Sequence, residues 1–282
     1  MDAANQPGQQ APSRLRRWEW ALATALTVAI VCGHVYFWRH VGGFWRDEVN
    51  TFNLASRPSL AAMAQDSFPV LMPLLLHGWM ALGLDRTDAE VRLLGFGVGL
   101  GILAAIWFAG WKIHRSPPLL LLALLGANAT LIVYGDALRA YGLGSLFILL
   151  AVTGAIAFLR KPSWARAMGL ALLFVLSVQT LYHNAILVGA ICAGAMAVCL
   201  RQRNGKGVVQ IFAAGTIAAM TLLPYVPMLI GARDTAAVVR TGATFSRLYG
   251  KFSDCLGFPF QFYILIWVLL ALATVIRGFS TG

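Results

Sequence analysis

Long apolar runs separated by short polar segments make up most of this chain. The first run extends from about residue 18 to residue 37, which is long enough to cross the roughly 30 Å hydrocarbon core of a bilayer. The pattern predicts an all-α, polytopic membrane protein with about eight transmembrane spans. The other expected spans lie at about 92–111, 118–134, 140–159, 165–181, 184–200, 208–230 and 257–276.

The first outer loop, residues 38–91, mixes polar and apolar positions. Residues 47–57 suit a short helix, which Pro58 would end because proline lacks an amide donor, and Ser59 suits the cap of a second short turn. Residues 69–84 would give only about 24 Å of helix. We interpret them as an interfacial or re-entrant helix on the outer side. A short true span is the alternative, and it would reverse the sidedness of all later segments.

The apolar stretch 165–200 is expected to break. Its 36 residues would form a helix of roughly 54 Å, which is too long for one crossing. We therefore expect a tight outer turn at the polar cluster of this stretch. The cluster consists of Gln179, Tyr182, His183 and Asn184.

The composition agrees with a membrane protein and argues against a soluble domain. The 282 residues are 59% hydrophobic and 12% charged, whereas soluble domains are usually about 25% charged. The net charge of +11 is spread over short loops, so it indicates membrane orientation and argues against nucleic-acid binding. Arg14, Arg16 and Arg17 precede the first span and place the N-terminus in the cytoplasm. We divide the chain into a basic tail (1–17), without a cleavable signal peptide, and a transmembrane domain (18–282).

Two adjacent carboxylates, Asp47 and Glu48, follow the first span at the point where it leaves the bilayer. Arg46 precedes them, after the aromatic residues Phe44 and Trp45. Charges are costly in hydrocarbon, so an acidic pair at a membrane exit is a candidate functional site. Neighbours on a helix point about 100° apart, so one carboxylate would face a cavity while the other bonds to the scaffold or a cation. The alternative is a solvated acidic loop.

A second polar cluster follows the expected span at 118–134. Asp136 and Arg139 are three residues apart, so we expect them on one helix face, where they would pair with each other or hold an anionic group. Arg139 with Tyr141 suits a phosphate, because guanidinium geometry matches phosphate oxygens. The alternative is an interfacial ion pair at a helix start, with Asp136 near the positive end of the helix dipole.

Two further residues complete the candidate set. His183 suits titration near neutrality, metal ligation or donation to a phosphate, but a lone histidine in an apolar region is often only a structural residue. Arg92 lies where an outer loop enters a span, and it either joins the site or extends toward the lipid headgroups. We expect the polar clusters around Asp47, Asp136 and His183 to converge on one side of the membrane.

Five sequence elements, in this order, resemble the polyprenyl-phosphate-dependent GT-C glycosyltransferases. That group includes protein O-mannosyltransferases and the aminoarabinose transferases that act on lipid A. The resemblance covers roughly residues 18–230. The elements follow an N-terminal span. They are an outer-loop Arg46-Asp47-Glu48, a short Pro-containing helix, a small-residue turn from Asp88 to Arg92, the segment from Asp136 to Tyr141, and Tyr182-His183.

The resemblance implies a glycosyltransferase that moves a sugar from a polyprenyl-phosphate donor to a lipid, glycan or protein acceptor at the extracytoplasmic face. Asp47 would be the general base, and Glu48 would orient it or contact a cation. The implied cofactor is at most a divalent metal ion, held by Glu48 and His183. The expected location is a bacterial inner (plasma) membrane. The residues expected around the donor are Arg46, Arg92, Asp136, Arg139, Tyr141 and His183.

The chain departs from these relatives at three places. Residues 67–70 read Ser-Phe-Pro-Val where many relatives carry a His-Pro-Pro-like or Glu-Lys-Pro element, so a polar ligand is absent there unless Asp66 replaces it. Asp136 lies three residues before Arg139, whereas relatives often have two. Both differences weaken the expectation of a bound metal. The chain also ends directly after a span, and we expect it to lack the part that chooses the acceptor.

Two other functions are compatible with the same pattern. A transporter or flippase would use the outer cavity without chemistry, but it predicts charges buried in mid-span and discontinuous helices. The acids here cluster instead near one membrane face. The other alternative is an inactive relative that acts as a partner subunit.

Overall fold

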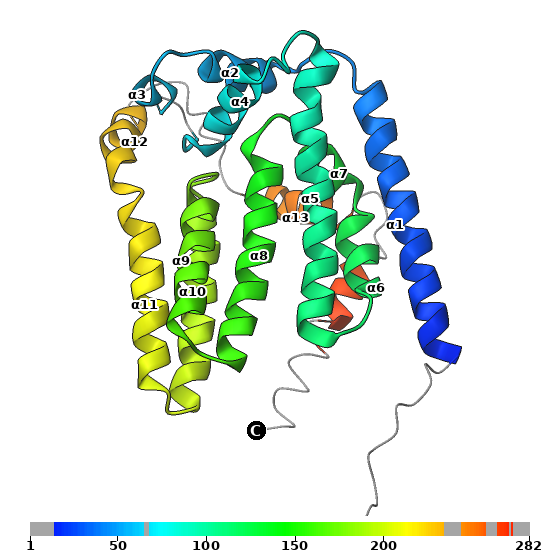
Figure 1. Ribbon diagram of the computed structural model, residues 1–282, viewed down its shortest axis with the longest axis vertical. Coiled ribbons are helices and arrows are strands. Elements are labelled where there is room, and N and C mark those ends of the chain that lie inside the picture. Colours follow the sequence, from blue (N-terminus) through cyan, green and yellow to red (C-terminus); the bar gives the residue numbers. More distant parts are fainter. Residues whose placement is uncertain (1–13, 65–67, 234–243, 258–263, 271, 273–282) are drawn as a thin grey trace, which may run out of the picture.

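The computed structural model describes residues 14–64, 68–233, 244–257, 264–270 and 272, and this part of the chain is helical, without strands (Figure 1). The expected all-α class is confirmed. Helices α1 to α5 are Arg14–His40, Arg46–Ala55, Leu60–Met63, Leu71–Ala81 and Asp88–His114. Next come α6, the π-helix η1, α7, α8 and α9, which are Leu119–Leu121, Leu122–Gly126, Ala129–Asp136, Ala140–Arg160 and Trp164–Val178. The last are α10, α11, the 3-10 helix η2, α12 and α13, which are Asn184–Arg201, Gly205–Met220, Leu223–Tyr225, Val226–Arg233 and Phe245–Gly257.

Five helical segments are long and apolar enough to cross a membrane, which agrees with a multi-pass membrane protein. They are α1, α5, α8, α10 and the segment 205–231 that contains α11. The bent pair formed by 119–126 and 129–136 would be a sixth if it is one span. Helix α9 has 15 residues, about 22 Å of helix, and is shorter than the hydrocarbon core. The count of about eight spans stays a prediction, and most of the expected span 257–276 lies outside the described residues.

Two helices bent by 69° occupy the expected span at 118–134, and the crossing of the membrane by this segment stays a prediction. The first half ends in η1, where the Ala127 N–H donates to the Leu122 carbonyl five residues earlier (2.8 Å). The second half starts anew because the Asn128 side chain accepts from the Leu131 N–H (3.2 Å) and caps α7. A local capping residue therefore divides a continuous apolar run.

The break expected at 179–184 is confirmed, since α9 ends before this segment and α10 begins within it. The buried Asn184 amide donates to the Gly144 carbonyl of α8 (3.3 Å), so the turn is attached to a neighbouring helix. The Gln179 carbonyl accepts from the Leu71 N–H (3.1 Å), which attaches α4 to the same turn. The turn between α9 and α10 is thus attached to α8 and to α4.

The helices alternate in direction, so their connections gather at two ends of the bundle (Figure 1). One end, the α2 end, carries α2, α4, the α7–α8 junction (137–139) and the α9–α10 turn (179–183). The other, the short-loop end, carries the connections 115–118, 161–163 and 202–204. The segments that carry Asp47, Asp136 and His183 therefore lie toward one end. Which end faces the cytoplasm stays a prediction.

Three short helices, α2, α3 and α4, lie in the loop 38–91, as expected. Ser59 caps α3 by accepting from the Ala62 N–H (3.2 Å). Helix α4 has 11 residues, about 16 Å, which is too short to cross a bilayer. Its His77 ring lies 2.7 Å from the Ala55 carbonyl, so α4 is hydrogen-bonded to the end of α2.

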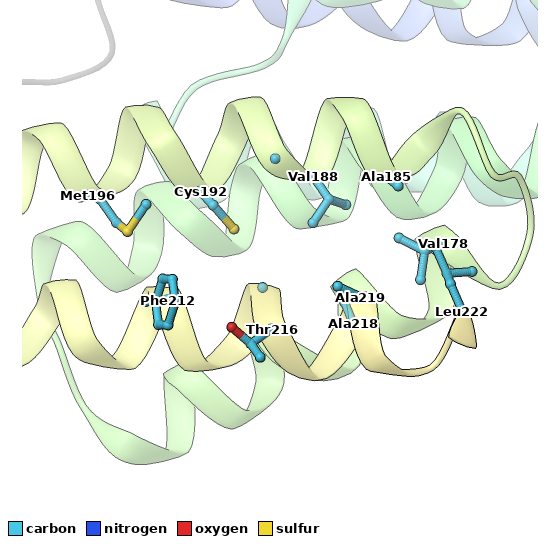
Figure 2. Close-up of a pocket in the computed structure, with 12 residues that line it drawn as sticks. Val178, Ala185, Val188, Cys192, Met196, Phe212, Thr216, Ala218, Ala219 and Leu222 are labelled. Carbon is cyan, nitrogen blue, oxygen red and sulfur yellow. The ribbon is translucent and has the colours of Figure 1, made fainter. Parts of the chain in front are cut away.

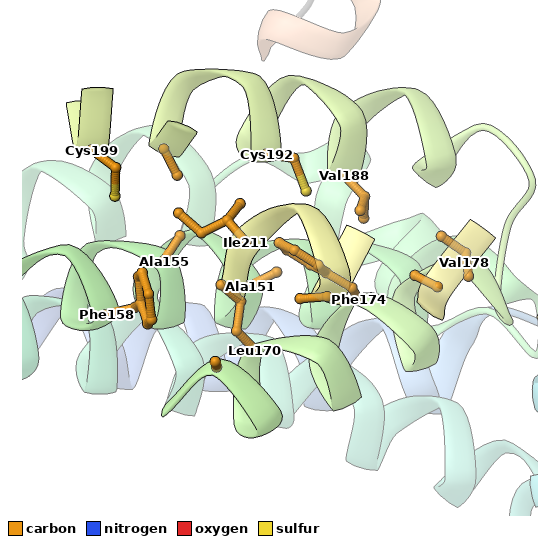
Figure 3. Close-up of a cluster of buried hydrophobic side chains, with 14 residues drawn as sticks. Ala151, Ala155, Phe158, Leu170, Phe174, Val178, Val188, Cys192, Cys199 and Ile211 are labelled. Carbon is orange, nitrogen blue, oxygen red and sulfur yellow. The ribbon is translucent and has the colours of Figure 1, made fainter. Parts of the chain in front are cut away.

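Helices α8, α9, α10 and α11 pack around a cluster of buried apolar side chains (Figure 3). Phe158 of α8, Leu170 and Phe174 of α9, and Ile211 of α11 supply its large side chains. Small side chains let the helix backbones approach closely, as is usual for helix packing in membranes. The alanines of this cluster are Ala151, Ala155, Ala167, Ala195, Ala214 and Ala218.

The contact between α5 and the end of α7 requires glycine. A Cβ atom added to Gly99 would overlap with Oδ1 of Asp136, and one added to Gly95 would overlap with the Asp136 carbonyl. Gly97, on the exposed face of α5, has no neighbouring atom within 4 Å of an added Cβ. Two glycines four residues apart on one face therefore let α7 lie against α5.

Gly99→Ala should destabilise the protein by about 1–3 kcal/mol, because the added methyl group must displace the buried carboxylate of Asp136. Gly97→Ala is the matched control and should change stability by no more than about 1 kcal/mol, in the stabilising direction. Unfolding in detergent, followed by tryptophan fluorescence, measures the difference. Equal stability of the two variants would contradict the close packing of α5 on α7.

Candidate functional site

A buried ion pair joins Glu48 of α2 to Arg92 of α5. Glu48 is 2% exposed and Arg92 is 4% exposed. Arg92 Nη1 donates to Oε1 (3.1 Å) and Nη2 donates to Oε2 (3.0 Å), so the pair is bidentate. Nη2 also donates to the Gly43 carbonyl (2.9 Å), and the guanidinium lies 4.6 Å from the centre of the Phe44 ring. Both terminal nitrogens of Arg92 are thus occupied within the protein, while its Nε is buried without a hydrogen-bond partner among the described residues. Its expected contact with the donor stays a prediction.

The carboxylate of Glu48 also accepts two backbone N–H groups. Leu138 donates to Oε1 (3.0 Å) and Trp45 donates to Oε2 (3.2 Å). Each oxygen therefore has two donors, which is the full capacity of a carboxylate. The geometry leaves no lone pair for the expected metal ion. Among the described residues, no three His, Cys, Asp or Glu side chains are grouped so that they could hold one.

Asp47, the residue before Glu48 on α2, faces outward. Its side chain is 52% exposed, and its Oδ2 lies 3.6 Å from Nη2 of the buried Arg139. The rotation of about 100° between neighbours on a helix separates the roles of the two carboxylates, as expected. Asp47 is therefore the member of the acidic pair that a second molecule can reach.

Arg139 is held in place from several sides. Its Nη1 donates to the Asp47 carbonyl (3.0 Å) and to the Thr51 hydroxyl (3.2 Å). Its guanidinium lies 4.4 Å from the centre of the Phe68 ring and 5.9 Å from that of Tyr141. Its Nε is buried and has no hydrogen-bond partner within the described part of the chain. A buried donor without a partner is costly, so Arg139 has hydrogen-bonding capacity left for a ligand.

Asp136 and Arg139 do not share a helix face, so that expectation was wrong. Helix α7 ends at Asp136, and Ala137 is extended (φ −66°, ψ 146°) before α8 begins. The Leu138 N–H, which would bond within a continuous helix, donates instead to Glu48. A carboxylate ninety residues away along the chain therefore competes for the backbone and ends the helix.

Asp136 pairs with His34 of α1. His34 Nδ1 lies 2.7 Å from Oδ1 and 2.9 Å from Oδ2, and Asp136 is 3% exposed. Gly99 of α5 leaves the space in which the two side chains meet. This pair connects α1, α5 and α7, and its geometry assigns Asp136 to helix packing.

Four aromatic rings lie in series next to the guanidinium of Arg139. The ring centroids are 5.9 Å apart for Trp45 and Tyr134, 5.7 Å for Tyr134 and Tyr141, and 5.9 Å for Tyr141 and Phe68. Trp45 and Tyr134 are exposed, so the series reaches the surface. Rigid apolar surface beside a few charged groups is typical of a ligand site.

Two expected site residues, Arg46 and His183, lie at the same end without joining this group. Arg46 is the first residue of α2, and His183 immediately precedes α10; both are exposed. Within the described residues, no hydrogen bond, ion pair or ring contact joins either side chain to Asp47 or Arg139. Their participation in donor binding stays a prediction.

An apolar groove of about 400 Å³ runs between α10 and α11 (Figure 2). Val188, Cys192 and Met196 of α10 face Phe212 and Thr216 of α11 across it. One end of the groove lies beside the α9–α10 turn. The residues that line this end are Val178, Ala185 and Leu222.

Three contributors are not among the site residues expected from the sequence. The sequence could have indicated His34, because an ionisable residue within an apolar run usually pairs with another polar group there. Phe68 lies in the segment that departs from the GT-C pattern, and its ring now supports Arg139. Nothing in the sequence marks Thr51, because its hydroxyl meets Arg139 only after α2 has packed against the α7–α8 junction.

No protein-family model matches the chain, and no curated protein or solved structure matches it. The GT-C resemblance of the five sequence elements therefore has no support from these comparisons. A functional assignment depends on the residues and on their geometry.

Glu48→Gln should destabilise the protein by about 3–5 kcal/mol, because the amide keeps the shape but leaves Arg92 buried without a counter-charge. Asp85→Asn, at an acid of the loop 38–91 that has no hydrogen-bond or ion-pair partner within the described residues, is the control and should cost less than about 1 kcal/mol. Thermal unfolding in detergent measures both values. A Glu48→Gln variant as stable as the wild type would show that the ion pair is not structural.

Proposed function

We propose that this protein is a membrane glycosyltransferase that moves a sugar from a polyprenyl-phosphate donor to a hydroxyl group of a lipid, glycan or protein acceptor. One observation carries the proposal: the accessible carboxylate of Asp47 lies 3.6 Å from a buried guanidinium, Arg139, that has unused hydrogen-bonding capacity. Transfer from a lipid phosphate needs a base for the hydroxyl and a cation for the phosphate. The GT-C resemblance of the sequence points to the same reaction.

Asp47 acts as the general base. Its carboxylate takes the proton of the acceptor hydroxyl as that oxygen attacks the anomeric carbon. The bond between this carbon and the phosphate oxygen breaks, and the electron pair leaves with the polyprenyl phosphate. A single displacement of this kind inverts the configuration at the anomeric carbon. Glu48 cannot share this role, because its four acceptor positions are occupied.

Arg139 stabilises the departing phosphate. Negative charge grows on the leaving oxygen, and a buried, preorganised guanidinium stabilises it without reorganising. Nη1 donates to Asp47 and Thr51, and Nη2 lies 3.6 Å from the Asp47 carboxylate, so Nε is the group that remains for the phosphate. The rings of Phe68 and Tyr141 keep the guanidinium in place.

The groove between α10 and α11 suits the prenyl chain of the donor. Its walls include Val188, Met196 and Phe212, and its volume of about 400 Å³ lies within the usual range for ligand sites. It starts beside the turn that carries His183, where the donor headgroup would pass toward Asp47. The groove therefore provides a binding site for the apolar prenyl chain of the donor on the same molecule.

A transporter or flippase for a lipid-linked sugar is the second candidate, and two observations favour it. Discontinuous helices and buried ionisable residues are typical of transporters. This chain has the bent α6–η1–α7 segment and the buried pair of His34 and Asp136. Transport leaves the bond between sugar and phosphate intact, so donor cleavage separates the two functions.

Asp47→Asn should lower donor turnover at least about 100-fold, because it removes the base and keeps the shape. The purified full chain is incubated with candidate polyprenyl-phosphate sugars and acceptors, and cleavage of the donor is followed by mass spectrometry. Asp85→Asn, in the same outer loop, is the control and should keep wild-type turnover, since Asp85 has no hydrogen-bond or ion-pair partner within the described residues. Unchanged turnover in Asp47→Asn would rule out its catalytic role, and donor movement across vesicles without cleavage would favour the transporter.

Arg139→Lys should lower donor turnover about 100-fold, because lysine keeps the charge but lacks Nε and the planar fork. Arg86→Lys, at an exposed arginine of the same outer loop, is the control. Unfolding midpoints of both variants separate a loss of chemistry from a loss of structure. Repeating the wild-type assay with a chelator tests the divalent metal, and an Arg139→Lys variant with full turnover would exclude the phosphate role.

A further inference from the structure

A second, smaller groove lies between α5, α8 and α9, toward the short-loop end. Its volume is about 220 Å³, below the roughly 300–1,000 Å³ of pockets that take compact small molecules. The hydroxyl of Thr153, which lies in its wall, donates to the Leu149 carbonyl of its own helix (2.8 Å). The groove is therefore apolar over most of its surface and suits a narrow chain. Its large apolar side chains are Phe108, Leu150, Leu170 and Leu173.

Two cations line the part of this groove nearest the short loops. Lys112 of α5 is exposed, and its ammonium group has no hydrogen bond or ion pair with the described residues. Arg166 of α9 uses Nη1 to donate to the carbonyls of Ala157 (3.0 Å) and Lys161 (2.8 Å). Its Nε and Nη2 make no hydrogen bond within the described part of the chain. The groove thus combines an apolar interior with two positively charged side chains at one end, which have N–H groups left for a ligand.

No acid offsets this charge in the neighbouring loops. The segments 112–118, 157–166 and 198–208 contain no Asp or Glu. A cationic surface of this kind attracts anionic lipid headgroups. The eight basic residues of these segments are Lys112, Arg115, Arg160, Lys161, Arg166, Arg201, Arg203 and Lys206.

We propose that this groove binds one anionic phospholipid. The lipid phosphate lies against Lys112 and Arg166, and one acyl chain lies along Phe108 and Leu173. Charge complementarity favours an anionic headgroup over a zwitterionic one, and the apolar groove favours a lipid over a soluble phosphate. The site is at the opposite end of the bundle from Asp47, so it stands independently of the proposed transfer reaction.

Native mass spectrometry of the full chain in detergent, with added phosphatidylglycerol or phosphatidylcholine, tests the charge requirement. The wild type should retain phosphatidylglycerol at least about five-fold more tightly, since one Lys or Arg near a lipid surface contributes about this factor. Lys112→Gln should lower the retention of phosphatidylglycerol about five-fold and leave that of phosphatidylcholine unchanged. This variant removes no hydrogen bond within the described residues, so it should fold normally.

Gly169→Leu tests the groove itself. Gly169 lines the groove, and an added Cβ has no neighbouring atom within 4 Å, so a leucine there should occupy the groove. This variant should lose most of the retained phosphatidylglycerol. Gly194→Leu is the matched control, because it lies on the exposed face of α10, lines neither of the two grooves and is equally open. It should retain the lipid as the wild type does.

Three results would overturn the proposal. One is equal retention of the two lipids by the wild type, and another is unchanged retention of phosphatidylglycerol in both Lys112→Gln and Gly169→Leu. The third is displacement of the lipid by inorganic phosphate at the same molar concentration, which would assign the cations to a soluble anion. Unfolding midpoints identify a misfolded variant, and Lys112→Gln decides the test if Gly169→Leu does not fold.

Discussion

The buried pair of Glu48 and Arg92 is the interaction on which the arrangement of the α2 end depends. Its carboxylate receives two donors from Arg92, one from the start of α2 and one from the α7–α8 junction. Arg92 lies 44 residues and Leu138 lies 90 residues after Glu48 in the chain, so three distant segments are joined at one point. A buried carboxylate is tolerated in an apolar surrounding only when its lone pairs are satisfied, and here all four are.

This constraint determines which carboxylate is left for chemistry. Because Glu48 turns inward to Arg92, the neighbouring Asp47 turns outward and meets Arg139 at the surface of the bundle. The same carboxylate ends α7 by taking the Leu138 N–H, so Arg139 leaves the helix and reaches back to α2. The ion pair that stabilises the fold therefore also builds the candidate site.

The two ends of the bundle have different chemistry. The α2 end combines acids, a buried arginine and a series of aromatic rings, which suits a ligand that carries both a charge and apolar surface. The segments 112–118, 157–166 and 198–208 at the short-loop end carry basic residues without acids, which suits contact with anionic headgroups. Between them, helices rich in alanine and glycine pack closely, so the polar groups of each end are held at fixed positions.

The sequence by itself determined the helical class, most long helices, the break at 179–184 and the different directions in which the Asp47 and Glu48 side chains point. These features follow from local causes: the length of apolar runs, capping residues and the 100° step of a helix. Only the tertiary structure decided that Glu48 holds Arg92, that Asp136 pairs with His34 and that Arg139 lies under Asp47. A charged group in an apolar interior pairs with the group that the packing of distant helices brings close to it. The spacing of residues along the sequence therefore does not predict its partner.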